Sequence, residues 1–573
     1  MLVCMESDKM SRVRPYAIVI LIFLSCTILM FWYGLPSPDQ DANNQRSEVG
    51  KESEMTLHVQ NLKRQLSETQ QNCTTQQLSL LTTPQITTTK SWQNFRGMRI
   101  VHFDLKGAPP KIAYLIQVME LAAKHGAKGF LLEYEDMFPW SGNLSMLATK
   151  HAYSRDDIKL LVDKAGSLGV QLIPFIPTFG HMEFVLKHQE FKHLRAVKRS
   201  TANICPLNEG SAILVKAMID QVVAAHPGIS WLHLGGDEVW NIKKCERCRN
   251  QTHTDTELYQ EHMIPILQYA TSSKLSPIIW DDMLRSWPAA DLKNIGQYAT
   301  PMVWCYEQDV VNYDHFPINM WEKYMEVFPR IFFASAFKGA TKPWSDFVFI
   351  KQRLDNNLSW LKIYHRFLKK GKTVVEGIAL TGWSRFDHYA PLCELLPAAI
   401  PSMVFCLAAL RYGRFDSSIH YETSMDLGNE SKFRIDVKNF ARYEPKYDTG
   451  TFPGGEVLPL LGEFEKAVDL TRNWADIRLN AWLRPYNVKR KHLSYFKLEN
   501  MIQDARTCLK IVERVEKSAR SILGKFFFDD TVEEWMQDKL YHVQRQAIKT
   551  MEMVQKVMSE HFDSDGNIKS DLN

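Results

Sequence analysis

Two adjacent acids, Asp237 and Glu238, stand near the end of the stretch WLHLGGDEVW at residues 231–240. The stretch predicts a buried strand that ends in two glycines followed by two carboxylates. Because glycine has no side chain, a ligand can approach the backbone closely there. Successive strand residues point to opposite sides, but where the pleat relaxes into a loop both acids can reach one ligand. The pattern indicates acid–base chemistry, and its structural alternative is an acidic cap of a following helix.

Paired carboxyl groups suit the cleavage of a glycosidic bond, which needs a proton for the leaving oxygen and a nucleophile for the anomeric carbon. A sugar with a 2-acetamido group supplies its own nucleophile, the acetamide carbonyl oxygen. The protein then needs one general acid/base and one carboxylate that orients the acetamide N–H. A water-poor pocket and a general acid tuned to the working pH would supply much of the rate. This chemistry needs no cofactor and no metal.

The elements that must position these acids begin at Arg99, where short apolar runs start to alternate with longer amphipathic stretches. Eight buried strands with helical connections predict an α/β fold, a parallel (β/α)8 barrel, with a doubly wound open sheet as the alternative. The predicted strands are 99–104, 128–136, 170–176, 231–238, 277–282, 302–307, 330–335 and 376–383. The predicted helices between them are 111–125, 154–168, 211–226, 254–273, 346–369 and 390–412.

Polar and aromatic residues recur at the ends of these strands, where a barrel assembles its active site. They include His102, Asp104, residues 133–136, Trp280, Asp282, Trp304, Tyr306 and Trp383. Such residues are expected to converge although they lie far apart in the chain. For each tryptophan, packing in the core is the alternative to a role in the site.

The string His233-Leu-Gly-Gly-Asp-Glu238 is similar to the signature of the family 20 glycoside hydrolases, the β-N-acetylhexosaminidases. Other stretches extend the resemblance in order over nearly the whole predicted barrel. They are HFDLKGAPPK (102–111), LLEYEDMFPW (131–140), FGHMEFVLKH (179–188), IIWDDMLR (278–285), ASAFKGAT (334–341), TGWSRFDHY (381–389) and CELLPA (393–398). The resemblance implies an exo-acting β-N-acetylhexosaminidase, with Glu238 as general acid/base and Asp237 as the acetamide-orienting carboxylate.

The resemblance also implies roles for the other candidates. His181 would tune the acid pair or contact the sugar, with Glu183 as its support. The aromatic residues Trp280, Trp304 and Trp383 would wall the acetamide methyl and the sugar face, while Tyr306 would donate to the acetamide carbonyl. Asp104, Asp282 and Asp387 would hydrogen-bond sugar hydroxyls. Buried packing, or exposure on a helix in the case of Glu183, is the alternative for each.

Two positions depart from the family pattern. Lysosomal members carry Asp-x-x-Arg after the first strand, whereas this chain has Asp104-Leu-Lys106-Gly107. They carry Trp-x-Glu after the last strand, whereas here Trp383 is followed by Ser384 and Arg385. Lysine cannot replace the bidentate hydrogen bonding of arginine. The departures leave open whether gluco- or galacto-configured N-acetylhexosamines are accepted.

The N-terminal part predicts membrane attachment. Residues 16–35 contain no charge and at ~1.5 Å per residue span ~30 Å, the thickness of a bilayer core. Arg12 and Arg14 precede them and keep residues 1–15 cytoplasmic. A cleaved signal peptide is the alternative, but no clear cleavage pattern follows. The sequence thus predicts a type II single-pass protein whose catalytic part is lumenal, in the Golgi or another endomembrane compartment, or extracellular. N-glycosylation sequons at Asn72, Asn143, Asn250, Asn357 and Asn429 agree with this location.

Residues 36–95 predict a lumenal stalk, residues 96–455 the catalytic barrel and residues 456–573 a helical C-terminal extension. In the stalk, Met55, Val59, Leu62 and Leu66 recur at helical spacing. They would form either a short coiled coil, which would make the protein a homodimer, or a solvated helix. The extension carries no motif with chemical meaning, and helices are expected at 456–483 and 492–561.

The cysteines and the net charge limit the metal sites and partners that can be expected. Cys4 and Cys26 fall before or within the anchor, and eight cysteines remain. Cys245 and Cys248 form C-E-R-C, but a zinc site needs a second ligand pair, and none stands at recognisable spacing. A local disulfide or two free thiols is therefore expected.

The net charge of +4 gives no reason to expect nucleic-acid binding. A catalytically silent glycan-binding protein and a membrane-tethered interaction protein on the same fold remain as alternatives.

Overall fold

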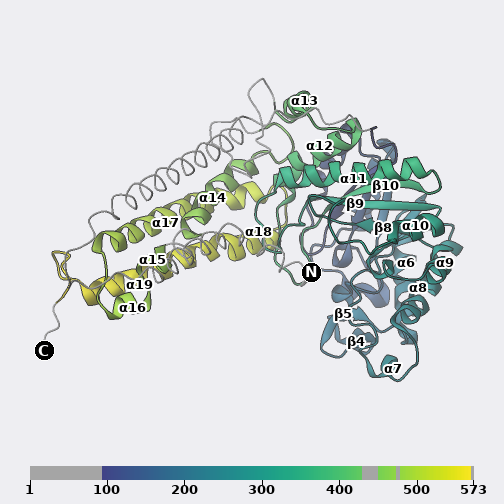
Figure 1. The fold of residues 1–573 in the computed structure, drawn as a ribbon, viewed down its shortest axis with the longest axis horizontal. Helices are drawn as coiled ribbons and strands as arrows, with labels where there is room; N and C mark the ends of the chain where they lie inside the picture. The colour runs from purple at the N-terminus through teal and green to yellow at the C-terminus, as the bar shows by residue number, and fades with distance from the viewer. Residues whose placement is uncertain (1–92, 429–449, 473–477, 570–573) are drawn as a thin grey trace, which may run out of the picture. The chain divides into compact units, whose positions relative to one another are not determined.

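The computed structural model describes residues 93–428, 450–472 and 478–569 (Figure 1). The predicted cytoplasmic tail, the membrane anchor at 16–35 and nearly all of the predicted stalk lie outside these residues. Within the described ranges, no helix is both long enough and apolar enough to cross a bilayer.

Eight parallel strands form a closed barrel, which confirms the predicted fold and excludes the open sheet. The barrel order is β1-β10-β9-β8-β7-β6-β3-β2. The strands are β1 (Met98–Asp104), β2 (Gly129–Glu133), β3 (Gln171–Phe175), β6 (Trp231–His233), β7 (Ser276–Trp280), β8 (Thr300–Trp304), β9 (Arg330–Lys338) and β10 (Val374–Gly382). Closure pairs the first strand with the last, with Met98 opposite Gly377, so the barrel has no open edge.

Helices connect the strands and surround the barrel (Figure 1). They are α3 (Ile112–Lys124), α4 (Arg155–Ser167), α6 (Glu209–Ala225), α8 (Asp255–Ser272), α9 (Ala289–Gly296), α10 (Met320–Val327), α11 (Ile350–Lys370), α12 (Leu396–Tyr412) and α13 (Ser417–Leu427). Local sequence sets several of their starts. Capping boxes begin α4, through Ser154 and Asp157, and α8, through Thr254 and Glu257.

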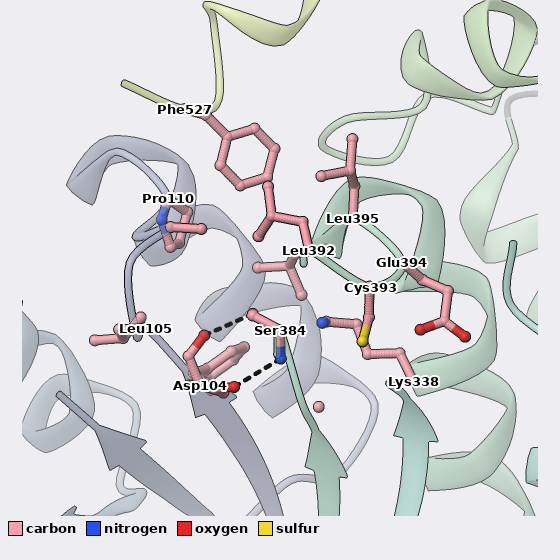
Figure 2. Close-up of a pocket in the computed structure, with 14 residues that line it drawn as sticks. Asp104, Leu105, Pro110, Lys338, Ser384, Leu392, Cys393, Glu394, Leu395 and Phe527 are labelled. Carbon is pink, nitrogen blue, oxygen red and sulfur yellow. Dashed lines mark hydrogen bonds between the residues drawn. The ribbon is translucent and has the colours of Figure 1, made fainter. Parts of the chain in front are cut away.

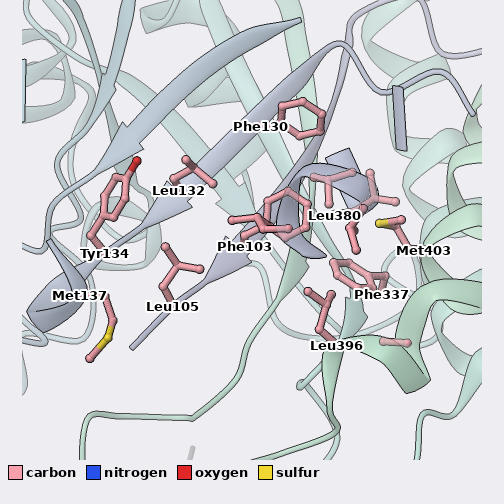
Figure 3. Packing of buried hydrophobic residues seen from close by; sticks show 14 of the residues in the cluster. Phe103, Leu105, Phe130, Leu132, Tyr134, Met137, Phe337, Leu380, Leu396 and Met403 are labelled. Carbon is pink, nitrogen blue, oxygen red and sulfur yellow. The ribbon is translucent and has the colours of Figure 1, made fainter. Parts of the chain in front are cut away.

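Alternation along each strand separates two apolar layers. Side chains such as Ile100, Leu131 and Phe332 fill the barrel interior. The alternate residues of the same strands, such as Phe103, Phe130 and Leu132, face outward. They pack against the surrounding helices, where Leu396 and Met403 of α12 belong to the same cluster (Figure 3). Side chains alternate along a strand, so the residues at every second position after the interior ones also point into the barrel. Near the strand ends these inward residues are His102, Glu133, His233, Trp280 and Trp304. Polar and aromatic inward positions therefore accumulate at the C-terminal ends of the strands, as predicted.

Several strands are shorter than the sequence suggests, and the difference is largest in two of them. The predicted strand 128–136 ends at Glu133, and Glu135–Met137 form a 3-10 turn. The predicted strand 231–238 ends at His233, because Gly235 and Gly236 have φ of 62° and 87°, which no strand residue adopts. The acid pair therefore lies on a loop. Another element was not predicted: a two-stranded antiparallel hairpin outside the barrel, made of β4 (Arg195–Val197) and β5 (Ser200–Ile204).

The chain after the barrel is mostly helical. Its helices are α14 (Val457–Arg472), α15 (Leu479–Trp482), α16 (Pro485–Lys489), α17 (Tyr495–Leu523), α18 (Asp529–Trp535), a π-helical turn (Met536–Leu540) and α19 (Tyr541–His561). Helix α14 contacts α12, and α12 is buried from Leu396 to Leu410. This cover explains why α12 is apolar all round rather than on one stripe.

Arg385, which follows β10, links the barrel to α18. Its Nη1 donates to Glu534 Oε1 at 2.6 Å, and its Nη2 donates to Glu534 Oε2. The remaining N–H groups donate to the carbonyl oxygens of Lys106, Gly107 and Ala390, so all five donors of the guanidinium are used. The Arg385 and Glu534 side chains are only 9% and 25% exposed. The helical extension is thus joined to the two loops at the barrel mouth by a bidentate ion pair.

We expect Glu534→Ala to lower the free energy of unfolding by about 2 kcal/mol or more, because Arg385 would keep its burial and lose its counter-charge. Urea unfolding of the purified chain measures this. The matched control is Glu533→Ala, which breaks an exposed ion pair with Arg520 and should change stability by under about 0.5 kcal/mol. Equal effects of the two substitutions would contradict the assigned role of the Arg385 pair.

Candidate active site

The loop after β6 presents the acid pair, and its glycines allow the close packing beneath it. Tyr259 of α8 donates its hydroxyl to the carbonyl oxygen of Gly236 at 2.7 Å. A Cβ at Gly236 would lie 2.5 Å from that hydroxyl oxygen. At the facing loop, a Cβ at Gly180 would lie 2.0 Å from the carbonyl oxygen of Asp237. The two loops therefore approach each other more closely than any side chain at these positions would permit.

Asp237 and Glu238 converge on one imidazole nitrogen. His181 Nε2 lies 3.3 Å from Asp237 Oδ2 and 3.3 Å from Glu238 Oε2. The three side chains remain partly exposed, at 19% for His181, 13% for Asp237 and 24% for Glu238. His181 and Glu238 have φ of 54° and 48°, in the left-handed region that non-glycine residues seldom adopt. Such backbone strain, about 1–3 kcal/mol per residue, is typical of functional sites.

The charges of this trio are coupled. Burial alone would lower the pKa of His181, but the carboxylates of Asp237 and Glu238 raise it well above its ordinary value. Burial alone would raise the pKa of Glu238, but the hydrogen bond and positive charge of His181 hold it below its ordinary value. The free site therefore favours the imidazolium form of His181 beside an ionised Glu238, and this positive charge limits the repulsion between the adjacent acids.

Asp282, after β7, fixes the backbone of the acid pair. Its Oδ2 accepts the backbone N–H of Glu238 at 2.9 Å, and its Oδ1 accepts Trp304 Nε1–H at 3.2 Å. Burial, then the charge of Asp237, raises the pKa of Asp282 to about 7. The structure thus brings Asp282 to the site as a support for Glu238 and Trp304, whereas the sequence suggested a direct contact with sugar hydroxyls.

Four aromatic residues gather at the mouth of the barrel next to the acids. Trp304 and Tyr306 stack with centroids 5.3 Å apart, and Trp383 lies 6.5 Å from Tyr306 and 6.0 Å from Trp280. Trp280 is only 1% exposed and forms the floor, whereas the other three are partly exposed. Burial raises the pKa of Tyr306, and the carboxylates of Asp237 and Glu238 raise it further. The Tyr306 hydroxyl therefore stays protonated and lies within the field of the acid pair.

His233, the first residue of the family-like motif, lies below this cluster. It is fully buried between Phe175 and Trp280, with ring centroids 4.4 and 4.6 Å away. Its Nδ1 accepts the backbone N–H of Gly235 at 3.1 Å. Burial lowers the pKa of His233 well below its ordinary value, so the ring is neutral and acts as an acceptor that shapes the loop.

Polar residues continue the site beyond His181, and two of them, Lys187 and His388, were not predicted from the sequence. Glu183 lies within the field of His181, Glu135 and Asp387, and burial raises its pKa to about 7. His388 contacts Glu135 Oε2 through Nδ1 at 2.8 Å. Lys187 Nζ lies 2.9 Å from His388 Nε2 and 3.5 Å from Asp136 Oδ2. One oxygen each of Glu135, Asp136 and Glu183 is buried without a hydrogen-bond partner within the described chain, although Lys106 Nζ lies 4.0 Å from Glu135 Oε1.

Two predicted residues use carboxylate oxygens to hold loops around the site. Asp104 is buried, and its oxygens accept the backbone N–H groups of Ser384 and Lys106 and pair with Lys106 Nζ at 2.9 Å. Asp387 Oδ1 accepts the backbone N–H groups of Tyr389 and Ala390 and so forms a local turn. Both acids shape the loops around the site. The burial of Asp104 gives no support to its predicted contact with sugar hydroxyls, whereas for the half-buried Asp387 that contact stays a prediction.

The two departures from the family pattern have structural roles. Lys106 is 2% exposed, pairs with Asp104 and Glu133, and lies 5.0 Å from the ring centroid of Trp383. Gly107 stands where the pattern has arginine, and Arg385, at the position of the family glutamate, donates to the Gly107 carbonyl oxygen. These cations support loops, and neither replaces the family arginine as a free donor to sugar.

A separate pocket lies behind Asp104 and contains neither acid of the pair (Figure 2). Lys338, Ser384, Cys393 and Glu394 line it from the barrel, and Phe527 closes it from the C-terminal part. Because Asp104 is the one predicted site residue among its lining residues, we do not assign the chemistry to this pocket.

Among the described residues, two side-chain clusters have the composition of a metal site. Glu135, Asp136 and His388 form one, but Lys187 and Lys106 already provide positive charge there. The other consists of Cys205, Cys245 and Cys248. The sequence analysis had recognised Cys245 and Cys248 alone, because Cys205 lies forty positions earlier in the chain.

Comparison with known proteins identifies the family. The model of the glycosyl hydrolase family 20 catalytic domain matches residues 75–316. Hexosaminidase D of Homo sapiens is 36% identical over 458 residues, covering 78% of this chain and 91% of that protein. The chain belongs to glycosyl hydrolase family 20. Hexosaminidase D of Bos taurus is 41% identical over 343 residues, covering 58% of this chain and 98% of that protein. This family 20 member is therefore an enzyme, a glycoside hydrolase.

Solved structures similar to this family 20 chain are more distant. The β-N-acetylhexosaminidase from Bacteroides fragilis has a TM-score of 0.42 and 16% identity, over 56% of this chain and 66% of that chain, just under two thirds. The Streptomyces plicatus N-acetyl-β-hexosaminidase with Thio-NAglucal has a TM-score of 0.41 and 14% identity, over 59% and 67%. Similarities at this level carry no argument about the site.

We expect the charge of Glu183 to oppose folding at neutral pH. Its pKa is about 7 in the folded chain but near 4.5 when unfolded, so between these values only the unfolded chain loses the proton. The free energy of unfolding therefore falls as pH rises from 4.5 to 7. In Glu183→Gln, the free energy of unfolding should fall by about 3 kcal/mol less over this pH range than in wild type.

Urea unfolding at a series of pH values measures the effect. The control is Glu190→Gln, which changes an exposed acid nearby and should leave the pH dependence unchanged. A Glu183→Gln profile that runs parallel to wild type would show that Glu183 ionises at its ordinary pH.

Proposed function

We propose that this enzyme is an exo-β-N-acetylhexosaminidase that releases terminal GlcNAc or GalNAc by substrate-assisted, retaining hydrolysis. The convergence of Asp237 and Glu238 on His181 Nε2, each at 3.3 Å, is the observation that carries this proposal. The similarity to proteins named hexosaminidase D supports the same activity. Two partly exposed carboxyl groups at one point can act on one sugar, which groups on different faces could not.

In the proposed reaction, Asp237 accepts the acetamide N–H and the acetamide carbonyl oxygen attacks the anomeric carbon as the glycosidic bond breaks. The proton of Glu238 passes to the leaving oxygen, and an oxazolinium-like cation forms on the sugar. Water then adds at the anomeric carbon, Glu238 recovers a proton from it, and the acetamide is restored with retained configuration. Because His181 lowers the pKa of Glu238, acidic conditions favour the protonated form that the first step needs.

The aromatic cluster supports recognition of the acetamide. Trp304, Tyr306 and Trp383 are partly exposed and provide apolar faces for the acetamide methyl and the sugar ring. The Tyr306 hydroxyl, which stays protonated, would donate to the acetamide carbonyl and hold it for attack.

Glu238→Gln should lower kcat on a chromogenic N-acetylhexosaminide by about 10³-fold, because the leaving oxygen loses its acid. Asp237→Asn should lower kcat strongly on the same substrate but should have little effect on residual cleavage of a hexoside without the acetamide. Rates on GlcNAc and GalNAc substrates between about pH 4 and 8 give the sugar preference.

The control is Glu246→Gln, an exposed acid at the start of the short helix that follows the acid-pair loop, which should retain wild-type kcat. If Glu238→Gln remains active, or if wild type binds the sugar and does not turn it over, the proposed function fails.

We propose further that residues 16–35 anchor the enzyme as a type II membrane protein with a lumenal or extracellular catalytic part. The stalk, and with it the predicted homodimer, stays a prediction from sequence. Two described sequons agree with the proposed location, since Asn143 and Asn250 are exposed. Asn357 is different: it is buried in α11 and hydrogen-bonds Ser335, Ala336 and Arg353. The sequence-based expectation of a glycan at Asn357 is incompatible with the folded structure.

Membrane-bound chain from cultured cells should resist extraction at alkaline pH, and removing N-glycans should increase its gel mobility. Asn143→Gln and Asn250→Gln should each abolish one step of that shift. Asn357→Gln should not alter the glycan count, and it should lower stability because it disturbs a buried hydrogen-bond network. A chain released by alkaline extraction and without N-glycans would contradict the location.

A further inference from the structure

Three cysteines from two separate loops meet beside the loop that bears the acid pair. Cys205 directly follows β5, and Cys245 and Cys248 lie at the start and within α7 (Glu246–Arg249). Cys205 Sγ lies 3.4 Å from Cys245 Sγ and 3.8 Å from Cys248 Sγ. All three sulfur atoms lie within 4.8 Å of one another, and Cys205 and Cys248 are buried.

These separations match a thiolate metal site. At a Zn–S distance of about 2.3 Å, tetrahedral geometry places two sulfur ligands about 3.8 Å apart. A disulfide would instead require about 2.05 Å, and a third cysteine would remain without a partner. Soft thiolate ligands select Zn²⁺ over the hard cations that prefer oxygen.

The backbone around Cys245 also suits a metal-bound thiolate. Cys245 caps the short turn of α7, and its Sγ accepts the backbone N–H of Cys248 at 3.3 Å. The C-x2-C spacing brings both sulfur atoms to one side of this turn. An N–H group directed at a ligand sulfur orients it and stabilises its negative charge. Cys205 then supplies the third sulfur from the hairpin loop, a contact that sequence spacing could not indicate.

We propose that Cys205, Cys245 and Cys248 bind one structural Zn²⁺ ion, with water as the fourth ligand, and that this ion ties the acid-pair loop to the β4–β5 hairpin. The proposal adds a site that the hydrolytic chemistry does not require. Three thiolates held this close repel one another, and a divalent cation between them removes that cost.

The ion would act on the active site through position. Between the cysteines and Glu238, the two loops are joined by Asn203, whose Nδ2 donates to Glu238 O at 3.4 Å and whose Oδ1 accepts Asn241 N–H at 3.2 Å. Asn241 Nδ2 donates in turn to Ser200 Oγ at 3.2 Å. The segment before the hairpin carries His181, and Met182 N–H donates to Ala202 O at 3.0 Å. Zn²⁺ would thus fix the loops that hold His181 against the acid pair.

The first test is the metal content of the full-length wild-type chain, purified without added metal or chelator, by plasma mass spectrometry. We expect about one zinc per chain. X-ray absorption at the zinc edge should show three sulfur neighbours at about 2.3 Å. A strong chelator should remove the metal and make Cys205, Cys245 and Cys248 reactive toward a maleimide probe.

The second test compares variants by metal content, thermal unfolding and kcat. Cys205→Ser with Cys248→Ser should lose the zinc, unfold at a lower temperature and lose kcat about tenfold or more. The control is Cys508→Ala, which removes a buried free thiol of α17 and should keep the zinc.

Copper or no metal in the wild-type chain, or a Cys205–Cys245 disulfide in peptides mapped without reduction, would overturn the proposal. Because metal content and sulfur coordination are measured without substrate, this outcome is independent of whether the chain cleaves N-acetylhexosaminides.

Discussion

One imidazole nitrogen, His181 Nε2, lies 3.3 Å from a carboxylate oxygen of Asp237 and 3.3 Å from one of Glu238. Neighbouring acids repel each other, and the cation of His181 offsets this repulsion and lowers the pKa of Glu238. The arrangement requires left-handed backbone at His181 and Glu238, and it requires the facing loops to come as close as Gly180 permits. Much of the surrounding structure serves this geometry: Asp282 holds the Glu238 backbone, Tyr259 holds the loop below, and the hairpin holds the segment that bears His181.

The barrel was predictable because its signals are local and repeated. Eight apolar runs separated by amphipathic stretches indicate a parallel sheet covered by helices. Residues at the ends of these strands that point into the barrel, such as Trp280 and Trp304, then lie together at the C-terminal mouth of the barrel. The glycines of the 231–240 stretch predicted the close approach of a ligand to the backbone, and in the structure the Tyr259 hydroxyl is the group that approaches Gly236 closely. What these patterns could not indicate was where the strands end, because an apolar residue, Tyr134 or Leu234, follows directly after Glu133 and His233.

Sequence reasoning failed where a side chain finds its partner far along the chain. The sequence predicted a free acid at Asp104, but its carboxylate pairs with Lys106 Nζ and accepts the backbone N–H of Ser384. Glu135 and His388 meet across more than 250 positions, and neither residue alone suggests the other. The same holds for Cys205, which turns an ordinary C-x2-C pair into a three-sulfur cluster. The residues at Asn357 match the N-glycosylation sequon, but Asn357 is buried in a helix and is not at the surface.

The occupied guanidinium of Arg385 has a consequence for small molecules aimed at this family. In members with the Asp-x-x-Arg pattern, an inhibitor can gain affinity from an arginine that grips its ring hydroxyls. Here Gly107 takes that place, and every donor of Arg385 is already directed to a carbonyl oxygen or to Glu534. Sugar mimics whose tight binding depends on that arginine should therefore discriminate against this enzyme. Selective compounds would instead have to gain their affinity from the partly exposed aromatic residues Trp304, Tyr306 and Trp383.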